Sequence, residues 1–333
     1  MTGGALLLGV DGGNTKSIAL VATPDGSIVG AGRSLGSSDI YAVPEDEAIR
    51  RLHEAADAAL AMAGRSAGNR AGAGDAAFSL AGADWPEDLE LLMARLRERW
   101  PRATVVNDAI GALRATNPHG PGVVVVCGTG AATAARGPDG RTWHSSFWQE
   151  AQGAHEMGVR ALQAVYRAAI GIDPPTALTP AILAALGEPD AETLLHRATG
   201  RATRGTIEPR RLAAVVLDAA EAGDAAALTI VRDHGTELGR MAVAAARRVG
   251  IERQSFDLAL AGGVIRHAGT ALTDAIARAA AERAPEVRIV RPSFEPAVGA
   301  LLLAFDTAGV LVSASVDRQL LATLPPSGLF DTR

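Results

Sequence analysis

Residues 11–16, Asp-Gly-Gly-Asn-Thr-Lys, join two apolar runs and combine a carboxylate, two glycines and a hydroxyl. Gly12 and Gly13 lack a Cβ atom, so their backbone N–H groups can approach an anion closely. The Thr15 hydroxyl adds a donor, and Asp11 suits Mg²⁺, which prefers few carboxylates and retained waters. These residues predict a loop that binds phosphate, although a plain glycine-rich hairpin fits the same residues.

Two further glycine segments follow apolar runs later in the chain. The run Gly122–Cys127 leads into Gly-Thr-Gly at 128–130 and then a second run, which repeats the strand–loop–strand pattern. The run Phe256–Ala261 leads into Gly-Gly at 262–263, and we expect a helix to follow it. The chain thus holds two predicted phosphate hairpins and one late strand–glycine element.

Hydrophobic periodicity predicts the elements that position these loops. Strands and helices are interspersed along the chain, which predicts an α/β fold. The expected strands are 5–11, 17–23, 27–33, 76–80, 103–107, 122–127, 258–261 and 287–290. The expected helices are 44–63, 86–99, one from about 108, 209–222, 224–250, 268–284 and 296–308.

Composition limits the class of protein. A length of 333 residues exceeds the usual size of a single core, so two domains are expected. Hydrophobic residues make up 48% and charged residues 21%, which is typical of a soluble globular chain. The net charge of −5 and the lack of a basic block argue against binding to nucleic acid or an anionic membrane. The N-terminal residues show no export signal, which predicts a cytoplasmic protein.

Three more motifs, together with the glycine segments, resemble a known superfamily. They are Leu80–Asp84, Val105–Ala109 and Pro296–Leu302. In their order and spacing they are similar to the actin/sugar-kinase/Hsp70 ATPases. Within that superfamily the chain, over about residues 5–310, resembles the N-acetylglucosamine kinase branch, also called the BadF/BadG/BcrA/BcrD ATPase group. No sequence repeat is evident, yet the resemblance implies two ribonuclease-H-like lobes around a central cleft.

The resemblance also implies how the chain divides and where ATP and Mg²⁺ bind. It implies an N-terminal lobe of 1–115, a C-terminal lobe of 116–309, and a segment from about 310 to 333 that packs back on the first lobe. Asp11 would orient Mg²⁺, and Gly262 and Gly263 would lie against adenosine with Arg266 beside the base or ribose. A plain tight turn also fits the two glycines. The residues implied at the phosphates are Gly12, Gly13, Asn14, Thr15, Lys16, Gly128, Thr129 and Gly130.

Asp108 is the candidate catalytic base. It follows Asn107 at the end of an expected strand, where open α/β sheets gather their ligands. It precedes Ala-Ile-Gly at 109–111, as the catalytic aspartate does in N-acetylglucosamine kinases. The resemblance therefore implies that Asp108 accepts the proton of an acceptor hydroxyl. Aspartate also frequently caps helices, so a structural role fits the same position.

At the sugar site the chain departs from the family pattern. Asp39 stands where the family usually has Asn, and Glu150 stands where its Gly-Asp-Glu-Gly-Ser segment has Asp. Gly82 completes the implied substrate residues. Two acids at hydroxyl-binding positions favour a cationic group, such as the ammonium of glucosamine or an aminocyclitol. Both acids fit equally well as solvated surface residues.

The resemblance implies ATP-dependent phosphorylation of an amino-sugar hydroxyl, with 6-OH expected, on glucosamine or N-acetylglucosamine; it allows a homodimer. One alternative is a non-catalytic regulator of the same fold that binds ATP and a sugar. A second is an ATPase coupled to electron transfer, whose relatives share a [4Fe–4S] cluster between subunits. Cys127 is the only cysteine and lies in an apolar run, so we expect a buried thiol and disfavour that role.

Overall fold

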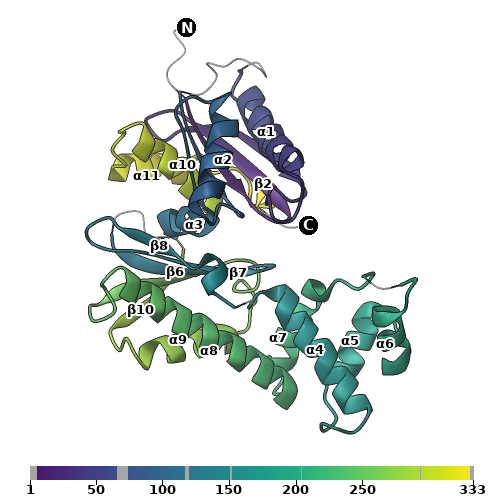
Figure 1. Ribbon diagram of the computed structural model, residues 1–333. Helices are drawn as coiled ribbons and strands as arrows, with labels where there is room; N and C mark the ends of the chain where they lie inside the picture. The colour runs from purple at the N-terminus through teal and green to yellow at the C-terminus, as the bar shows by residue number, and fades with distance from the viewer. Residues whose placement is uncertain are drawn as a thin grey trace. The chain divides into compact units, whose positions relative to one another are not determined.

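The computed structural model describes residues 6–65, 74–116, 120–150, 152–203, 205–292 and 294–330. The chain forms two compact units (Figure 1). The first unit combines residues 1–120 with 292–333, and the second is 121–291. Among the described residues, no helix is both long and apolar enough to cross a membrane.

The sheet of the first unit has five strands in the order β3-β2-β1-β4-β5. Strands β1, β2 and β3 form an antiparallel meander, whereas β4 and β5 run parallel to β1. The carboxyl ends of β1, β4 and β5 therefore meet at one edge. The strands are β1 Leu7–Gly12, β2 Lys16–Ala22, β3 Ile28–Leu35, β4 Asp75–Leu80 and β5 Ala103–Asn107.

Successive side chains of a strand point to opposite faces of the sheet, and helices cover both of these faces. Leu8 and Val10 of β1 pack with α1 (Glu45–Met62) and α2 (Pro86–Arg97). Leu7 belongs to the core of the other face. That face carries α3 (Asp108–Thr116), α10 (Pro296–Thr307) and α11 (Ala314–Ala322), and a 3₁₀ turn, Ser327–Leu329, follows.

The sheet of the second unit repeats the topology of the first. Its order is β10-β9-β6-β7-β8, with β6 and β7 antiparallel, β7 and β8 antiparallel, and β9 parallel to both β6 and β10. In both units a central strand has an antiparallel meander on one side and two parallel strands on the other. The expectation of two ribonuclease-H-like lobes is confirmed. The strands are β6 Gly122–Cys127, β7 Ala131–Arg136, β8 Thr142–His144, β9 Phe256–Ala261 and β10 Val287–Val290.

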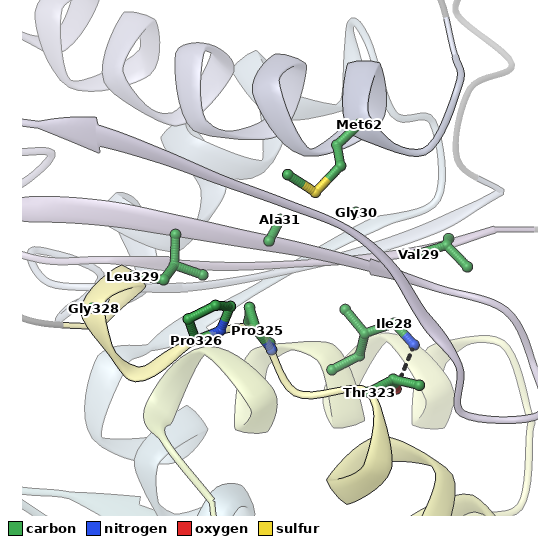
Figure 2. A pocket seen from close by; sticks show the side chains of 10 residues that line it. All are labelled: Ile28, Val29, Gly30, Ala31, Met62, Thr323, Pro325, Pro326, Gly328 and Leu329. Carbon is green, nitrogen blue, oxygen red and sulfur yellow. Dashed lines mark hydrogen bonds between the residues drawn. The ribbon is translucent and has the colours of Figure 1, made fainter.

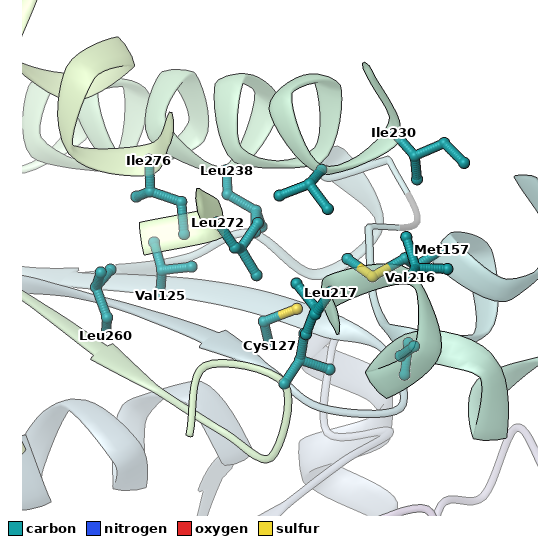
Figure 3. Close-up of a cluster of buried hydrophobic side chains, with 14 of the residues drawn as sticks. Val125, Cys127, Met157, Val216, Leu217, Ile230, Leu238, Leu260, Leu272 and Ile276 are labelled. Atoms are coloured by element: carbon teal, nitrogen blue, oxygen red, sulfur yellow. The ribbon is translucent and has the colours of Figure 1, made fainter. Parts of the chain in front are cut away.

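One face of the second sheet packs on helices in a single apolar core (Figure 3). Val125 and Cys127 of β6 lie in this core with Leu217, Leu238 and Ile276 from three helices. The helices are α4 Ala154–Ala169, α5 Leu178–Leu186, α6 Ala191–Thr199, α7 Ala213–Glu221, α8 Ala225–Arg248 and α9 Ala271–Ala281, with 3₁₀ turns at Ser146–Trp148 and Pro209–Leu212.

Two sequence-based expectations differ from the structure. Residues 292–309, expected in the second lobe, belong to the first unit because α10 packs on β1, where a Cβ atom on Gly9 would collide with the backbone of Leu301. The helix expected at 268–284 is present as α9, but it begins at Ala271, and turns rather than a helix follow Gly262-Gly263 directly.

Candidate functional site

The Asp-Gly-Gly-Asn-Thr-Lys loop joins β1 to β2 in the first unit. Gly13 N–H donates to the carbonyl of Lys16 (3.0 Å), which closes a tight turn. A Cβ atom on Gly12 would lie 2.7 Å from the end of the Leu80 side chain, so a larger residue there would force neighbouring side chains to shift. The nearest atom to a Cβ on Gly13 would be 3.6 Å away, so packing does not require the second glycine.

The other residues of this loop lie partly or fully exposed. Asn14 is exposed, whereas Thr15 is half-buried and its carbonyl accepts from the Gly36 N–H (3.0 Å). The Lys16 ammonium donates to the carbonyl of Phe330, near the C-terminus. That contact joins the loop to the C-terminal segment of the same unit.

Several carboxylates gather at the edge of the first sheet where β1, β4 and β5 end. Burial raises the pKa of Asp11 to about 7; the charges of Asp108 and Glu295 raise it further and that of Lys16 opposes them. Burial raises the pKa of Asp108 to about 6, and Asp84 and then Asp39 add to the rise. Charged groups from five segments far apart in sequence therefore act on Asp11 or Asp108.

Asp108 begins α3 directly after β5. Its carbonyl accepts from the Ser79 hydroxyl (3.2 Å), and the Asn107 Oδ1 accepts from the Ala109 N–H (3.0 Å). The Ala109 N–H also lowers the pKa of Asp108 against the effect of burial. Asn107 thus provides a side-chain acceptor for a backbone N–H group in the first turn of α3.

Asp39 and Gly82 lie against each other. Gly82 has φ +80°, and a Cβ atom there would collide with the Asp39 Oδ1. The same oxygen accepts from the Tyr41 N–H (2.8 Å), so Asp39 also stabilises the turn that follows it. Glycine at 82 is therefore required both by backbone conformation and by the approach of this carboxylate.

In the second unit, the Gly-Thr-Gly loop of 128–130 lies on the start of α4. Gly128 N–H donates to the Gly130 carbonyl (2.8 Å). The N–H groups of Ala154 and His155 donate to the carbonyls of Gly128 (2.8 Å) and Thr129 (3.2 Å). No atom lies within 4 Å of a Cβ built on Gly128 or Gly130, so the Cβ position of each faces open space, whereas the backbone of Gly130 lies close to Gly153.

The Gly262-Gly263 turn lies beside the end of β6, where the Gly-Thr-Gly loop starts. Gly262 has φ +103°, and a Cβ atom there would collide with the Cys127 carbonyl, which accepts from Val264 N–H (3.0 Å). Gly263 is exposed and open. Arg266 is also exposed, and its N–H donates to the Gly262 carbonyl (3.2 Å). The second unit thus brings its predicted nucleotide residues together.

Comparison with known proteins places the chain in a family. The model of the BadF/BadG/BcrA/BcrD ATPase family matches residues 8–304. The chain belongs to the BadF/BadG/BcrA/BcrD ATPase family. It is 24% identical over 315 residues to N-acetyl-D-glucosamine kinase of Dictyostelium discoideum, covering 91% of this chain and 98% of the relative. It is 26% identical over 304 residues to N-acetylmuramic acid/N-acetylglucosamine kinase of Clostridium acetobutylicum, covering 90% and 97%.

Solved structures agree with this assignment. A proposed N-acetylglucosamine kinase from Chromobacterium violaceum has a TM-score of 0.70 at 25% identity, covering 90% of this chain and 99% of that one. A ROK family glucokinase from Streptomyces griseus, in complex with glucose and AMPPNP, has a TM-score of 0.58 at 16% identity, covering 90% and 98%. The second likeness concerns the fold alone.

In this BadF/BadG/BcrA/BcrD family member, Glu150 lies on the segment between β8 and α4. It is exposed, as is Trp148, whose side chain is 70% accessible. Trp143 is half-buried against the core of the second unit, with the Arg248 guanidinium 5.9 Å from its ring centroid. The two tryptophans therefore differ in burial: Trp143 packs against the core, whereas Trp148 faces solvent.

Three residues of this family member were not identified as site residues from the sequence: Asp84, Asn107 and Glu295. Asp84 raises the pKa of Asp108, and Glu295 raises the pKa of Asp11. Asn107 accepts a hydrogen bond from the first turn of α3. A signal was present for both: Asn107 is the last residue of β5, Asp84 follows the end of β4 by four residues, and each belongs to a motif that carried the family resemblance. Glu295 has no such signal beyond preceding the proline that starts α10.

Apart from these residues, a shallow apolar pocket lies between β3, the end of α1 and the C-terminal segment (Figure 2). Ile28, Met62, Pro326 and Leu329 line it. No candidate site residue of this family member contributes to the lining. Its apolar walls do not suit a phosphate or a sugar hydroxyl.

The residues of this family member fit a Mg²⁺ ion that is coordinated partly by the protein and partly by the phosphates of a bound nucleotide. Within the described ranges, no group of three or more His, Cys, Asp or Glu side chains is arranged to hold a metal. A single carboxylate, Asp11, beside an open glycine turn matches an ion that takes further oxygens from phosphates and water. Cys127 is buried as expected, burial raises its pKa to about 12, and its Sγ donates to the Gln152 carbonyl (3.4 Å).

Proposed function

We propose that this protein is an ATP-dependent kinase that transfers a phosphoryl group to a hydroxyl of an amino sugar, the 6-OH being the expected acceptor. The observation that carries the proposal is Asp108, a carboxylate with a pKa of about 6 among other acids at the carboxyl end of β5. Membership of an ATPase family and curated relatives named as N-acetylglucosamine kinases support it.

Asp108 would accept the proton of the sugar hydroxyl. Its pKa, raised by burial and by Asp84, keeps it mainly ionised above pH 6 while making it a stronger base than a solvated aspartate. Phosphoryl transfer otherwise demands positioning and neutralisation of charge. The N–H groups of Gly13 and Gly128 already donate within their turns, so the backbone donors for the phosphates would come from the neighbouring loop residues Asn14, Thr15, Thr129 and Gly130. The turn at 262–263 would offer a flat surface for adenosine.

Asp11 would hold Mg²⁺ together with the phosphates of ATP. When bound, the ion would supply neutralisation of the charge on the transferred group. The pKa of Asp11, about 7 without a cation, indicates a carboxylate that gains from a positive partner. We propose Thr15 as a hydroxyl donor to the same phosphates. Lys16 already contacts Phe330, so its part in binding would require that contact to move.

N-acetylglucosamine is the first acceptor to test, because both curated relatives carry it in their names. Glucosamine is the second, because Asp39 places a carboxylate near Asp108. A charge-assisted hydrogen bond to an ammonium would favour the free amine by about 10²-fold. Glu150, exposed in the second unit, provides weaker support for the amine.

The test measures kcat/KM with both sugars for the wild type, Asp39→Asn and the control Glu90→Gln, an exposed acid on α2 outside the candidate site. Asparagine retains an Oδ1 acceptor for the Tyr41 N–H, so the turn is preserved and only the charge changes. If Asp39 binds an amine, Asp39→Asn lowers glucosamine use by about 10²-fold and leaves N-acetylglucosamine use nearly unchanged. A wild-type preference for N-acetylglucosamine excludes the amine version. Binding of ATP and sugar without turnover would contradict the kinase and favour the regulator.

A further inference from the structure

Asn107 is held at both ends of its side-chain amide. Its Nδ2 donates to the Asp84 Oδ1 (2.9 Å), and its Oδ1 accepts from the Ala109 N–H (3.0 Å). Because the donor meets a carboxylate and the acceptor meets an N–H group, only one of the two amide orientations satisfies both. Asn107 therefore connects Asp84 to the first turn of the helix that begins with Asp108.

Asp84 is itself held in place by the start of α2. The Asp88 Oδ2 accepts from the N–H groups of Asp84 (3.2 Å) and Trp85 (2.8 Å). The Asp88 carboxylate is buried and also accepts from the Tyr41 hydroxyl (3.1 and 3.0 Å). The turn that carries Asp84 is thus fixed before any ligand arrives.

The same contacts reach the candidate sugar acid. Tyr41, whose hydroxyl bonds to Asp88, donates its N–H to the Asp39 Oδ1 (2.8 Å). Hydrogen bonds between successive residues therefore connect Asp39, one candidate substrate residue, with α3, the helix that begins at Asp108. In order, the participants are Asp39, Tyr41, Asp88, Asp84, Asn107 and Ala109.

We propose that Asp84 is a positioning residue for the reaction: through Asn107 it fixes the start of α3 and so the direction in which Asp108 meets the acceptor hydroxyl. The inference rests on the proposed role of Asp108 as base. Loss of the Asp84 acceptor would leave the Asn107 amide held only by the Ala109 N–H, and rotation of the amide would weaken this bond to the first turn of α3. A displacement of about 1 Å at a reacting group can cost about 10²-fold in rate.

An exchange of the two side chains tests the contact itself. Asn107→Asp alone sets two carboxylates at the 2.9 Å contact, and we expect kcat at pH 8 to fall by about 30- to 100-fold. Asn107→Asp combined with Asp84→Asn restores an amide donor and a carboxylate acceptor in reversed order, with unchanged net charge. The exchanged pair should recover kcat to within about 5-fold of wild type, with KM for ATP unchanged throughout.

Glu90→Gln, an exposed position on α2, serves as the control for loss of a nearby acid and should leave kcat unchanged. Thermal unfolding of each variant measures the folded fraction. If kcat falls only in proportion to that fraction, or if the exchanged pair does not recover, Asp84 is structural and the inference is wrong.

A second measurement does not depend on catalysis. Hydrogen exchange at the Ala109 amide should be at least about 10-fold faster in Asp84→Ala than in wild type, and near wild type in the exchanged pair. If no sugar is phosphorylated, the proposed function fails while this exchange still reports on the Asp84–Asn107 contact. Unchanged exchange at Ala109 in Asp84→Ala overturns the positioning role.

Discussion

Asp108→Asn should make the protein more stable and much less active. The folded protein raises the pKa of Asp108 from 3.8 to about 6, so the native state binds this proton more tightly than the unfolded chain. The ionised carboxylate therefore opposes folding. The favourable contribution is fully present below pH 3.8 and is lost as the pH rises through 6.

The size of the effect follows from the shift. About two pKa units correspond to roughly 3 kcal/mol, and partial exposure reduces this, so asparagine should stabilise the fold by about 1–3 kcal/mol at pH 8. The gain should decrease towards zero between pH 6 and pH 4. Asparagine cannot accept the hydroxyl proton, so kcat should fall at least about 10²-fold.

Urea unfolding at pH 8, 6 and 4.5, with turnover measured at pH 8, checks both effects. Glu90→Gln, an exposed acid, is the control and should change neither quantity. Lower stability of Asp108→Asn at pH 8 would refute the reasoning, because it would mean that the ionised carboxylate stabilises its helix. Near-normal turnover would show that Asp108 is not the base. In the wild type, kcat/KM should decline as the pH falls below about 6.

Two further variants test the nucleotide residues. Asp11→Asn should raise the stability of the fold at pH 8, because burial lifts the pKa of Asp11 to about 7. It should also raise the Mg²⁺ concentration needed for half-maximal turnover by at least about 10-fold. An unchanged dependence on Mg²⁺ contradicts the metal role. Gly262→Ala should lower stability by about 3 kcal/mol or more, because its Cβ would collide with Cys127 and its φ is +103°. Gly263→Ala, the matched control, should cost under about 1 kcal/mol but weaken ATP binding in a fluorescence titration.

Most of the fold could be predicted from local patterns. The strands expected at 103–107, 122–127 and 287–290 have the observed bounds, because each apolar run ends at a polar residue, glycine or proline. The grouping of α10 with the first unit could not be predicted this way. It depends on the close approach of that helix to Gly9, nearly 300 residues earlier, and no local pattern records it.

The candidate site could be predicted only at positions where the type of residue by itself indicates a chemical role. Asp11 and Asp108 were found because aspartates at strand ends suit metal binding and proton transfer. The contact between Asp84 and Asn107 joins two turns 23 positions apart, and either residue alone fits many surface roles. Such positioning contacts become visible only when the strands that precede them are neighbours in the sheet, as β4 and β5 are.

The glycine motifs combine two requirements that the sequence cannot separate. A Cβ atom on Gly262 would collide with the backbone of Cys127, and one on Gly12 would press on the ends of neighbouring side chains, so packing favours glycine at both positions. A Cβ atom would meet nothing within 4 Å at Gly128 or Gly263 and only an ordinary contact at 3.6 Å at Gly13, so packing does not explain these three glycines. Each open glycine lies next to or one loop away from a packed one, which fixes the turn that carries it. The packed glycine shapes the loop. The N–H groups of Gly13 and Gly128 already donate within their own turns, so what these glycines provide is room for a phosphate beside the loop backbone.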